Sequence, residues 1–154
     1  MSAPLPTSRR AAARLAAVQA LYQLSEGAHE AREVIDQFVS VRTTEAGEGG
    51  MRPDADRGFF GELVEGSDSH RAELQPILEV ALAGRTWDRV DRLVKAILLA
   101  AAYELRFRPD VPARVAINEY VEIAHDFFDQ GEPGFINSVL DRVARTTRAA
   151  EFGP

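Results

Sequence analysis

The stretch from residue 103 to 128, YELRFRPDVPARVAINEYVEIAHDFF, constrains the fold more than any other part of the chain. Pro109 and Pro112 interrupt it, and proline both lacks an amide donor and disfavours helix at the residue before it. On both sides of this break, in residues 90–105 and 117–128, apolar residues recur at spacings of three and four. This spacing predicts two amphipathic helices. Because the connection is so short, the helices should pack as antiparallel neighbours.

Most of the remaining chain also follows helical spacing, and no segment shows a convincing strand or repeat pattern. The predicted helices span residues 8–25, 31–41, a segment ending near Gly66, a segment up to Gly84 and a last segment that begins near Pro133. Pro76 should kink or break the helix that contains it. Expected caps are Thr7 or Ser8, Asp54 or Asp56, and, for the first hairpin helix, Asp88. The sequence therefore predicts an all-α protein.

The length of 154 residues favours one domain spanning residues 1–154. Residues 1–7 contain two prolines and no periodic pattern, which indicates a flexible arm. Residues 43–56 are rich in glycine and acids, which indicates a surface loop. Residues 149–154 are expected to form a tail.

Composition excludes several classes of protein. The chain has no cysteine, so it has neither disulfides nor a thiolate metal site. The longest apolar run, residues 96–103, is too short to span a bilayer. The N-terminal region lacks the apolar stretch of a signal peptide. We therefore expect a cytoplasmic protein that does not contact a membrane.

The net charge of −6 argues against nucleic-acid binding, but the charges are unevenly distributed. Residues 1–25 contain no acid and carry Arg9, Arg10 and Arg14. The last two share a helical ridge with Val18 and Tyr22. Two interpretations remain open: a solvated helix start, which the residues alone favour, or a small phosphate-binding surface.

No catalytic pattern is present. His29, His70 and His125 lie far apart, and none has a neighbour at metal-ligand spacing. The chain has no phosphate-binding glycine loop, dinucleotide fingerprint or nucleophile elbow. We expect a helical binding or scaffold domain, with no enzymatic activity, cofactor or metal.

Three segments together resemble the NusB family of bacterial transcription antitermination factors. They are RRAAARLAAVQALY (residues 9–22), AILLAAAYEL followed by DVPARVAINEYVEIAHDF, and GFINSVLDRVAR (residues 134–145). Their order and spacing follow the family pattern along nearly the whole chain. The resemblance implies an all-α fold of about seven helices in two packed bundles.

The resemblance also implies a function. Members bind the single-stranded boxA element of leader RNA together with NusE, a small-subunit ribosomal protein, and join an antitermination complex on RNA polymerase during ribosomal RNA synthesis. The resemblance implies that the RNA-binding residues of this chain are Arg9, Arg10, Arg14, Gln19, Tyr22 and Phe135. The expected partner-binding residues, placed around the central hairpin, are Asp91, Lys95 and Glu104.

The chain departs from the family pattern at several positions. The start of the first helix has fewer basic residues than in many family members, because alanines occupy positions 11 and 12. Gly134 stands where a lysine often precedes the phenylalanine. These changes suggest weaker RNA binding by the protein alone. Val94 and Leu99 replace an acid and an arginine, which leaves the partner contacts open.

Two other functions compete with the adaptor. One is a domain of a ribosomal RNA cytosine methyltransferase, which the absence of a following catalytic domain disfavours. The other is a helical protein that contacts proteins alone. The oligomeric state is also open, since a homodimer could bury the RNA-binding surface.

Overall fold

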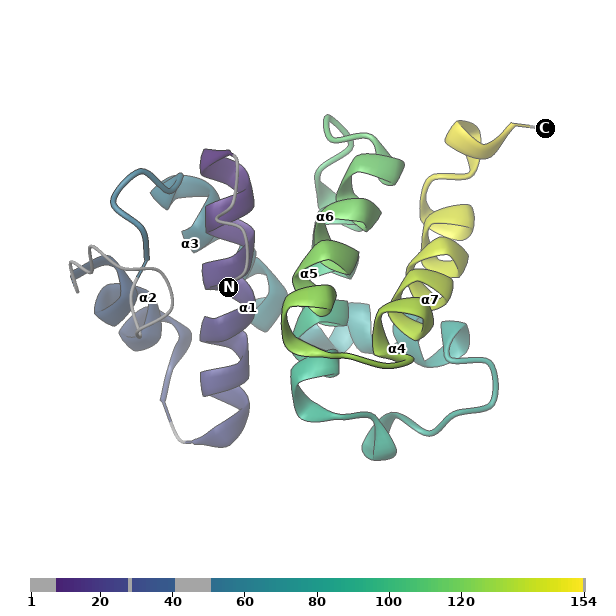
Figure 1. Cartoon of the computed structure of the whole chain (residues 1–154), viewed down its shortest axis with the longest axis horizontal. Helices are drawn as coiled ribbons and strands as arrows, with labels where there is room; N and C mark the ends of the chain where they lie inside the picture. The colour runs from purple at the N-terminus through teal and green to yellow at the C-terminus, as the bar shows by residue number, and fades with distance from the viewer. Residues whose placement is uncertain (1–7, 28, 41–50, 154) are drawn as a thin grey trace.

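The computed structural model of the chain describes residues 8–27, 29–40 and 51–153, and this part contains seven α-helices and no β-strand (Figure 1). The predicted all-α class with about seven helices is confirmed. In chain order the elements are α1 (Arg9–Glu26), α2 (Ala31–Ser40), α3 (Arg57–Ser69), α4 (Arg71–Ala81), the 3-10 helix η1 (Trp87–Arg89), α5 (Arg92–Phe107), α6 (Ala113–Phe127), α7 (Glu132–Thr147) and the 3-10 helix η2 (Ala149–Phe152).

Side chains cap three of the helix starts, where the first amides have no partner within the helix. Ser8 caps α1 and Asp56 caps α3, each accepting a hydrogen bond from the amide three residues later. Asp91 caps α5 by accepting from the amides two and three residues later. The expectation that Asp88 caps this helix was wrong, because Asp88 lies in η1 and the backbone at Val90 is still extended.

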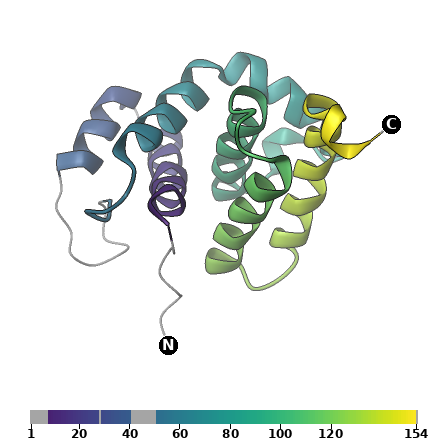
Figure 2. The ribbon, with the colours of Figure 1, turned by 90° about the horizontal axis from the view of Figure 1, so that it is seen from above.

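The helices form two groups, which confirms the expected pair of packed bundles. In Figure 1, α1, α2 and α3 lie on one side of the molecule, where all three contact one another. On the other side α5 packs against α4, α6 and α7. Figure 2 shows α3 and α4 following one another along the back of both groups. Because α5 also contacts α1 and α3, it joins the two groups into one core.

The predicted hairpin is the centre of this core. Helices α5 and α6 are adjacent, and Pro112 occupies the position just before α6. Every residue of α5 from Ala96 to Leu105 is buried. A helix that is apolar on all sides must be surrounded, and α5 is covered by five other helices.

Three local expectations differ from the structure or fall outside it. The expected arm (residues 1–7), positions 43–50 of the expected loop and Pro154 lie outside the described residues. The described end of the loop segment exposes Pro53 and Asp54 but buries the side chains of Met51 and Ala55. Its backbone is tied to α1, since the Asp56 amide donates to the carbonyl oxygen of Arg9.

Helix α4 continues through Pro76 without a break. Proline removes the amide that would bond the carbonyl of Ala72, but Ala72 is exposed and water can replace that partner.

The expected tail is helical over residues 149–152 and stays largely exposed, although one of its side chains packs on the core. Residues 149–152 form η2, and Phe152 lies against the core. The Glu151 carboxylate accepts a hydrogen bond from the amide of Ala113 at 2.9 Å, which fixes this segment to the start of α6.

Candidate nucleic-acid interface

The start of α1 presents two of the arginines that the sequence analysis assigned to RNA. Arg9 is exposed, and its Nε donates to the carbonyl oxygen of Asp54 at 3.0 Å. The Arg10 side chain is 43% exposed and lies 4.0 Å from the Asp110 carboxylate. Both guanidinium groups are therefore accessible to an anion at the N-terminal end of a helix, where the backbone dipole also favours negative charge.

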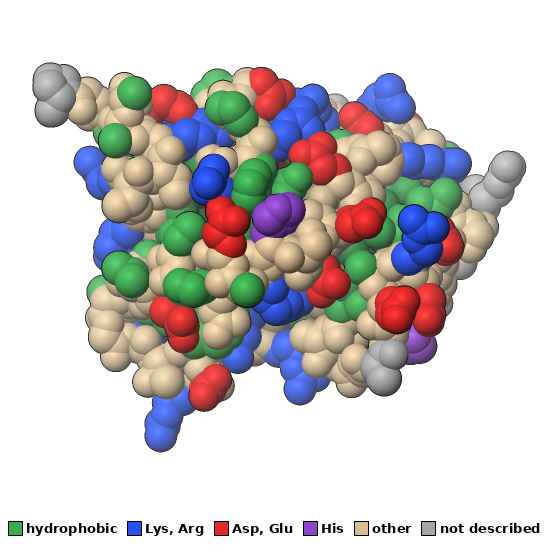
Figure 3. Space-filling model, turned by 180° about the vertical axis from the view of Figure 1, so that it is seen from behind, with side chains coloured by type: hydrophobic (Ala, Val, Ile, Leu, Met, Phe, Trp, Pro, Cys, Tyr) green, Lys and Arg blue, Asp and Glu red, His purple; other side chains and the backbone are tan. Residues whose placement is uncertain are grey.

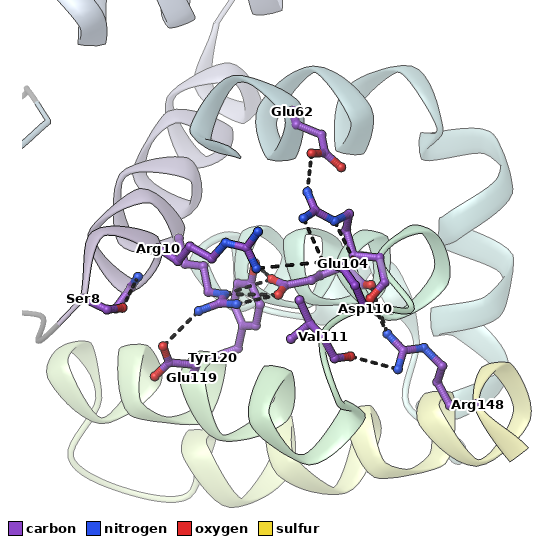
Figure 4. A network of polar contacts seen from close by, with 12 residues as sticks. Ser8, Arg10, Glu62, Glu104, Asp110, Val111, Glu119, Tyr120 and Arg148 are labelled. Carbon is purple, nitrogen blue, oxygen red and sulfur yellow. Dashed lines mark hydrogen bonds and ion pairs between the residues drawn. The ribbon is translucent and has the colours of Figure 1, made fainter. Parts of the chain in front are cut away.

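Arg14 does not belong to this exposed group, and its expected role as a phosphate contact is corrected by the structure. It is only 3% exposed, because α1 turns this side toward α5. Its Nε and one terminal nitrogen donate to both oxygens of Glu104, at 2.9 Å and 2.6 Å, and its other terminal nitrogen donates to Glu119 at 2.9 Å (Figure 4). With its donors engaged inside the protein, Arg14 cannot reach a phosphate in this conformation.

The buried cluster around Arg14 is internally satisfied. The Tyr120 hydroxyl donates to Glu104 at 2.9 Å, and both residues are fully buried. Burial, reinforced by the nearby Glu104 carboxylate, raises the pKa of Tyr120 well above its usual value, so the phenol remains a neutral donor. Burial alone would lower the pKa of Arg14, but hydrogen bonding and attraction from Glu104 raise it instead. The cluster therefore holds one cation against one buried carboxylate and a second carboxylate at its edge.

A second cluster of polar side chains lies at the α5–α6 turn beside Arg10. Arg108 donates to both oxygens of Asp110 at 3.0 Å and to Glu62 at 2.6 Å. The hydrogen bonds from Arg108 lower the pKa of Asp110 to about 2 and, with Glu62, raise the pKa of Arg108. Asp110 thus remains ionised at neutral pH, between the guanidinium groups of Arg108 and Arg10.

The ring of Phe59 lies beside arginines of both polar clusters. The guanidinium carbons of Arg10, Arg14 and Arg108 lie 5.0 Å, 5.2 Å and 5.1 Å from the centre of its ring. Cations at this distance are attracted to an aromatic ring. The ring therefore helps to fix the direction of Arg10, the most exposed of the three arginines.

Gln19 and Tyr22 lie further along α1, and both are half-buried. The carbonyl oxygen of Tyr22 accepts a hydrogen bond from Ser25, while its ring packs against the core. The structure thus places these two residues on the same helix as the arginines but nearer its other end.

Phe135 is separate from the arginines of α1. It lies in the first turn of α7, which begins at the end of the molecule where α1 finishes (Figure 1). The guanidinium carbon of Arg85 lies 4.3 Å from the centre of its ring. The expected RNA-binding residues therefore do not form one compact site, since Arg9 and Arg10 lie at the start of α1 and Phe135 lies in α7.

The expected partner-binding residues also differ in their surroundings. Glu104 is fully buried and bonded to Arg14, so it cannot touch a partner, and this expectation is corrected. Asp91 is exposed but serves as the cap of α5. Lys95 is half-buried, with its ammonium 5.3 Å from the ring centre of Trp87. Of the three, Asp91 and Lys95 remain accessible near the start of α5.

Sequence reasoning missed four residues near these clusters. Arg108 and Asp110 flank Pro109 beside Arg10, and Arg85 and Arg89 lie near Phe135. Their types carried no signal, because single arginines and aspartates in turns are common on protein surfaces. The helical spacing did contain the signal for Arg14, which stands four residues before the buried Val18 on the same ridge.

Two further classes of site are absent from the part of the chain that the structure describes. No group of three side chains there could hold a metal ion. Among the same residues, no helix is long and apolar enough to cross a membrane.

The face opposite to that of Figure 1 carries interspersed positive and negative side chains (Figure 3). That face offers no continuous basic surface for a nucleic acid.

Known proteins similar to this chain agree on one family. The model of the NusB family matches residues 11–145. The transcription antitermination protein NusB of Rhodopseudomonas palustris (strain BisB18) is 44% identical over 146 residues, which cover 94% of this chain and 86% of the relative. The protein of the same name from Maricaulis maris (strain MCS10) is 46% identical over 145 residues, which cover 93% and 90%.

A solved structure, T. maritima NusB, matches over the full length of both chains with a TM-score of 0.77. At 21% identity this match supports the fold alone. The sequence relatives are named as transcription antitermination proteins, a regulatory role, which confirms the expectation of a non-catalytic protein. Since the family model covers most of the chain and the relatives exceed 40% identity across nearly all of it, the chain belongs to the NusB family.

Proposed function

We propose that this protein is a transcription antitermination factor that binds boxA-type single-stranded leader RNA together with NusE. In this proposal the pair joins an antitermination complex on RNA polymerase during ribosomal RNA synthesis in the cytoplasm. The observation that carries the proposal is the match to the NusB family over residues 11–145, joined to relatives named as transcription antitermination proteins.

The surface chemistry supports an RNA ligand. Arg9 and Arg10 offer two accessible cations, in an N-terminal region of 25 residues that contains no acid. Tyr22 and Phe135 offer partly exposed rings. Cations that position a backbone and aromatic rings that stack on bases are the usual combination for binding a single strand. Arg14 contributes indirectly, by holding α1 against α5.

The region around the start of α5 is the proposed contact for NusE. Asp91 and Lys95 are accessible there, whereas Glu104 lies inside the core. A partner seated beside α1 would add contacts that two arginines alone cannot supply. This arrangement predicts that RNA binds more tightly to the pair than to this protein by itself.

The test measures binding to a boxA RNA and to a scrambled strand of equal length, with and without NusE, across a salt series. Arg9→Glu and Arg10→Glu should each weaken binding about tenfold or more, since each replaces a phosphate contact with repulsion. Loss of one contact should reduce the slope of log affinity against log salt by about 0.7. Arg32→Glu is the matched control, because it changes the same charge on the exposed side of α2.

Binding that prefers boxA, increases with NusE and depends on Arg9 and Arg10 but not on Arg32 would support the proposal. Equal affinity for the scrambled strand, or no binding with NusE present, would leave a helical protein that contacts proteins alone. Sedimentation of the unliganded protein, run in parallel, distinguishes a monomer from a homodimer that covers the RNA-binding surface.

A further inference from the structure

A pocket of roughly 300 Å³ lies where the last turns of α1, the start of α4 and the first turns of α5 meet. We call it the Trp87 pocket, and the residues that matter in it are Leu21, Arg71, Trp87, Arg92, Lys95 and Leu99. It contains the one tryptophan and the one lysine of the chain. Its volume is at the lower end of the range for small-molecule sites, so it suits a small ligand rather than a folded partner.

Three cations line this pocket. Arg71 is the first residue of α4 and Arg92 is the first residue of α5, while Lys95 follows one turn later. Two acids pair with them, since Asp68 lies 3.4 Å from Arg71 and Glu26 lies 3.7 Å from Arg92. The side chains of both pairs are 41–54% exposed, and exposed ion pairs are weak. Lys95 forms no salt bridge with a described residue, so the three cations exceed the two acids.

The floor of the pocket favours an anion. Leu21 and Leu99 are buried beneath it, and charges beside apolar walls attract an anion more strongly than charges in open water. Trp87 is 9% exposed, and its indole nitrogen donates to no described residue. Ser67 Oγ is the only buried side-chain polar atom without a partner in the described part of the chain, so the indole nitrogen reaches solvent and is free to donate.

The geometry points to the Trp87 pocket as a binding site for a small anion that carries a diphosphate group, held by Arg71, Arg92 and Lys95. Guanidinium groups bind phosphate oxygens in bidentate pairs, and an ammonium binds them as a point charge. A monoanion such as acetate would only replace a carboxylate that is already present. A diphosphate carries enough negative charge to pair with all three cations after both carboxylates have been displaced.

This inference goes beyond the proposed function, because it concerns a small ligand of the protein without RNA or NusE. Lys95 also belongs to the proposed NusE contact, so the ligand and the partner would share one cation. The pocket is separate from Arg9 and Arg10, which lie at the opposite end of α1.

The first measurement titrates inorganic pyrophosphate into the full chain at constant ionic strength. The fluorescence of the single tryptophan reports occupancy, and calorimetry gives the affinity. Arg71→Gln and Arg92→Gln should each weaken binding about tenfold, since each removes a charge-assisted hydrogen bond. Both side chains are about half exposed, so the fold should survive, which circular dichroism checks. Arg32→Gln is the matched control, because it removes the same charge from the exposed side of α2.

The second measurement uses the single lysine. Pyridoxal 5′-phosphate carries an aldehyde that forms an imine with an amine, and borohydride reduces this imine to a stable secondary amine. Peptide mapping then separates Lys95 from the N-terminal amine. Labelling of Lys95 should be faster with pyridoxal 5′-phosphate than with pyridoxal, which lacks the phosphate. It should be slowed by Arg92→Gln and blocked by pyrophosphate.

No saturable binding of pyrophosphate to the unaltered protein would overturn the site. Equal affinities for Arg92→Gln and Arg32→Gln would also overturn it, as would equal protection of Lys95 by acetate and by pyrophosphate at the same ionic strength. Protection by boxA RNA but not by pyrophosphate would assign the pocket to the RNA backbone and overturn the small ligand. None of these outcomes removes the proposed function, which the separate boxA titration with NusE tests.

Discussion

Arg14 and Glu104 show how a charged residue on a surface-like ridge becomes part of the core. Removing an ion pair from water costs more than the attraction returns unless the geometry is good and the remaining hydrogen-bonding groups are satisfied. Here the pair is bidentate, and Tyr120 and Glu119 complete the set. Such a pair adds little net stability over apolar residues, but it fixes how α1 lies against α5, because either charge left alone would be buried without a partner.

At the scale of this residue we predict that Arg14→Ala destabilises the protein by about 3–5 kcal/mol, since it leaves the Glu104 carboxylate buried and unpaired. The measurement is the free energy of unfolding from urea denaturation followed by circular dichroism. Arg10→Ala is the control, and because Arg10 is half-exposed its change should stay within about 0.5–1 kcal/mol. A similar small loss for both variants would show that Arg14 is not part of the core in solution.

Helices α3 and α5 approach closely at one point, where a glycine faces an aromatic ring. A Cβ atom on Gly66 would lie 2.2 Å from Cε1 of Tyr103, which is closer than any real contact. The ring has little freedom to yield, because its hydroxyl donates to Glu62 at 3.0 Å and it packs 5.1 Å from the ring of Phe107. The closeness of these two helices therefore depends on the missing side chain.

For this helix pair we predict that Gly66→Ala lowers the free energy of unfolding by about 1–3 kcal/mol, although alanine is the better helix former. Gly61→Ala is a matched control in the same helix, because its Cβ would meet no atom within 4 Å. That variant should stabilise the protein by about 0.5–1 kcal/mol. Shifts of the urea midpoint in the same direction for both variants would contradict the close packing.

A residue of the C-terminal segment, Arg148, ties the end of α7 to the α5–α6 turn. Arg148 is buried, and its guanidinium donates to the carbonyl oxygens of Leu105 at 2.7 Å, Arg108 at 2.7 Å and Val111 at 3.0 Å (Figure 4). These carbonyls belong to the end of α5 and the turn, where the helix supplies no partner. One side chain near the C-terminus thus holds the turn that carries Asp110 beside Arg10.

At this scale we predict that Arg148→Met destabilises the protein by on the order of 3 kcal/mol, because it leaves buried carbonyls without donors. Hydrogen exchange should show the largest loss of protection at the amides of Val111 and Ala113, which lie in this turn and at the start of α6. Arg145→Met is the control, since Arg145 is exposed and its contacts, with Asp141 and with the Phe152 ring at 4.9 Å, involve no carbonyl of the turn. Equal rates of hydrogen exchange at these amides in the two variants would show that Arg148 does not hold the turn.

Most of the fold could be predicted from the sequence, and much less of the candidate site could. Apolar spacing and the two prolines correctly gave the hairpin, and the all-α class followed from the same pattern elsewhere. The cap of α5 was displaced by three residues, because η1 inserts a turn that spacing cannot show. Of the arginines assigned to RNA, Arg9 and Arg10 are accessible and Arg14 is not. The sequence could not separate them, because all three carry the same charge and lie close together in the chain.

What the sequence alone determined about this protein is what depends on residues close together in the chain: the helices, their antiparallel central pair and the motifs that identify the family. The tertiary structure alone decided which charges are buried and which surfaces lie together. The partner of Arg14 stands 90 positions away at Glu104, and Arg85 contacts Phe135 of α7 from the connection between α4 and η1. Burial of a charge depends on a partner that only packing brings close, so helical periodicity could not reveal it.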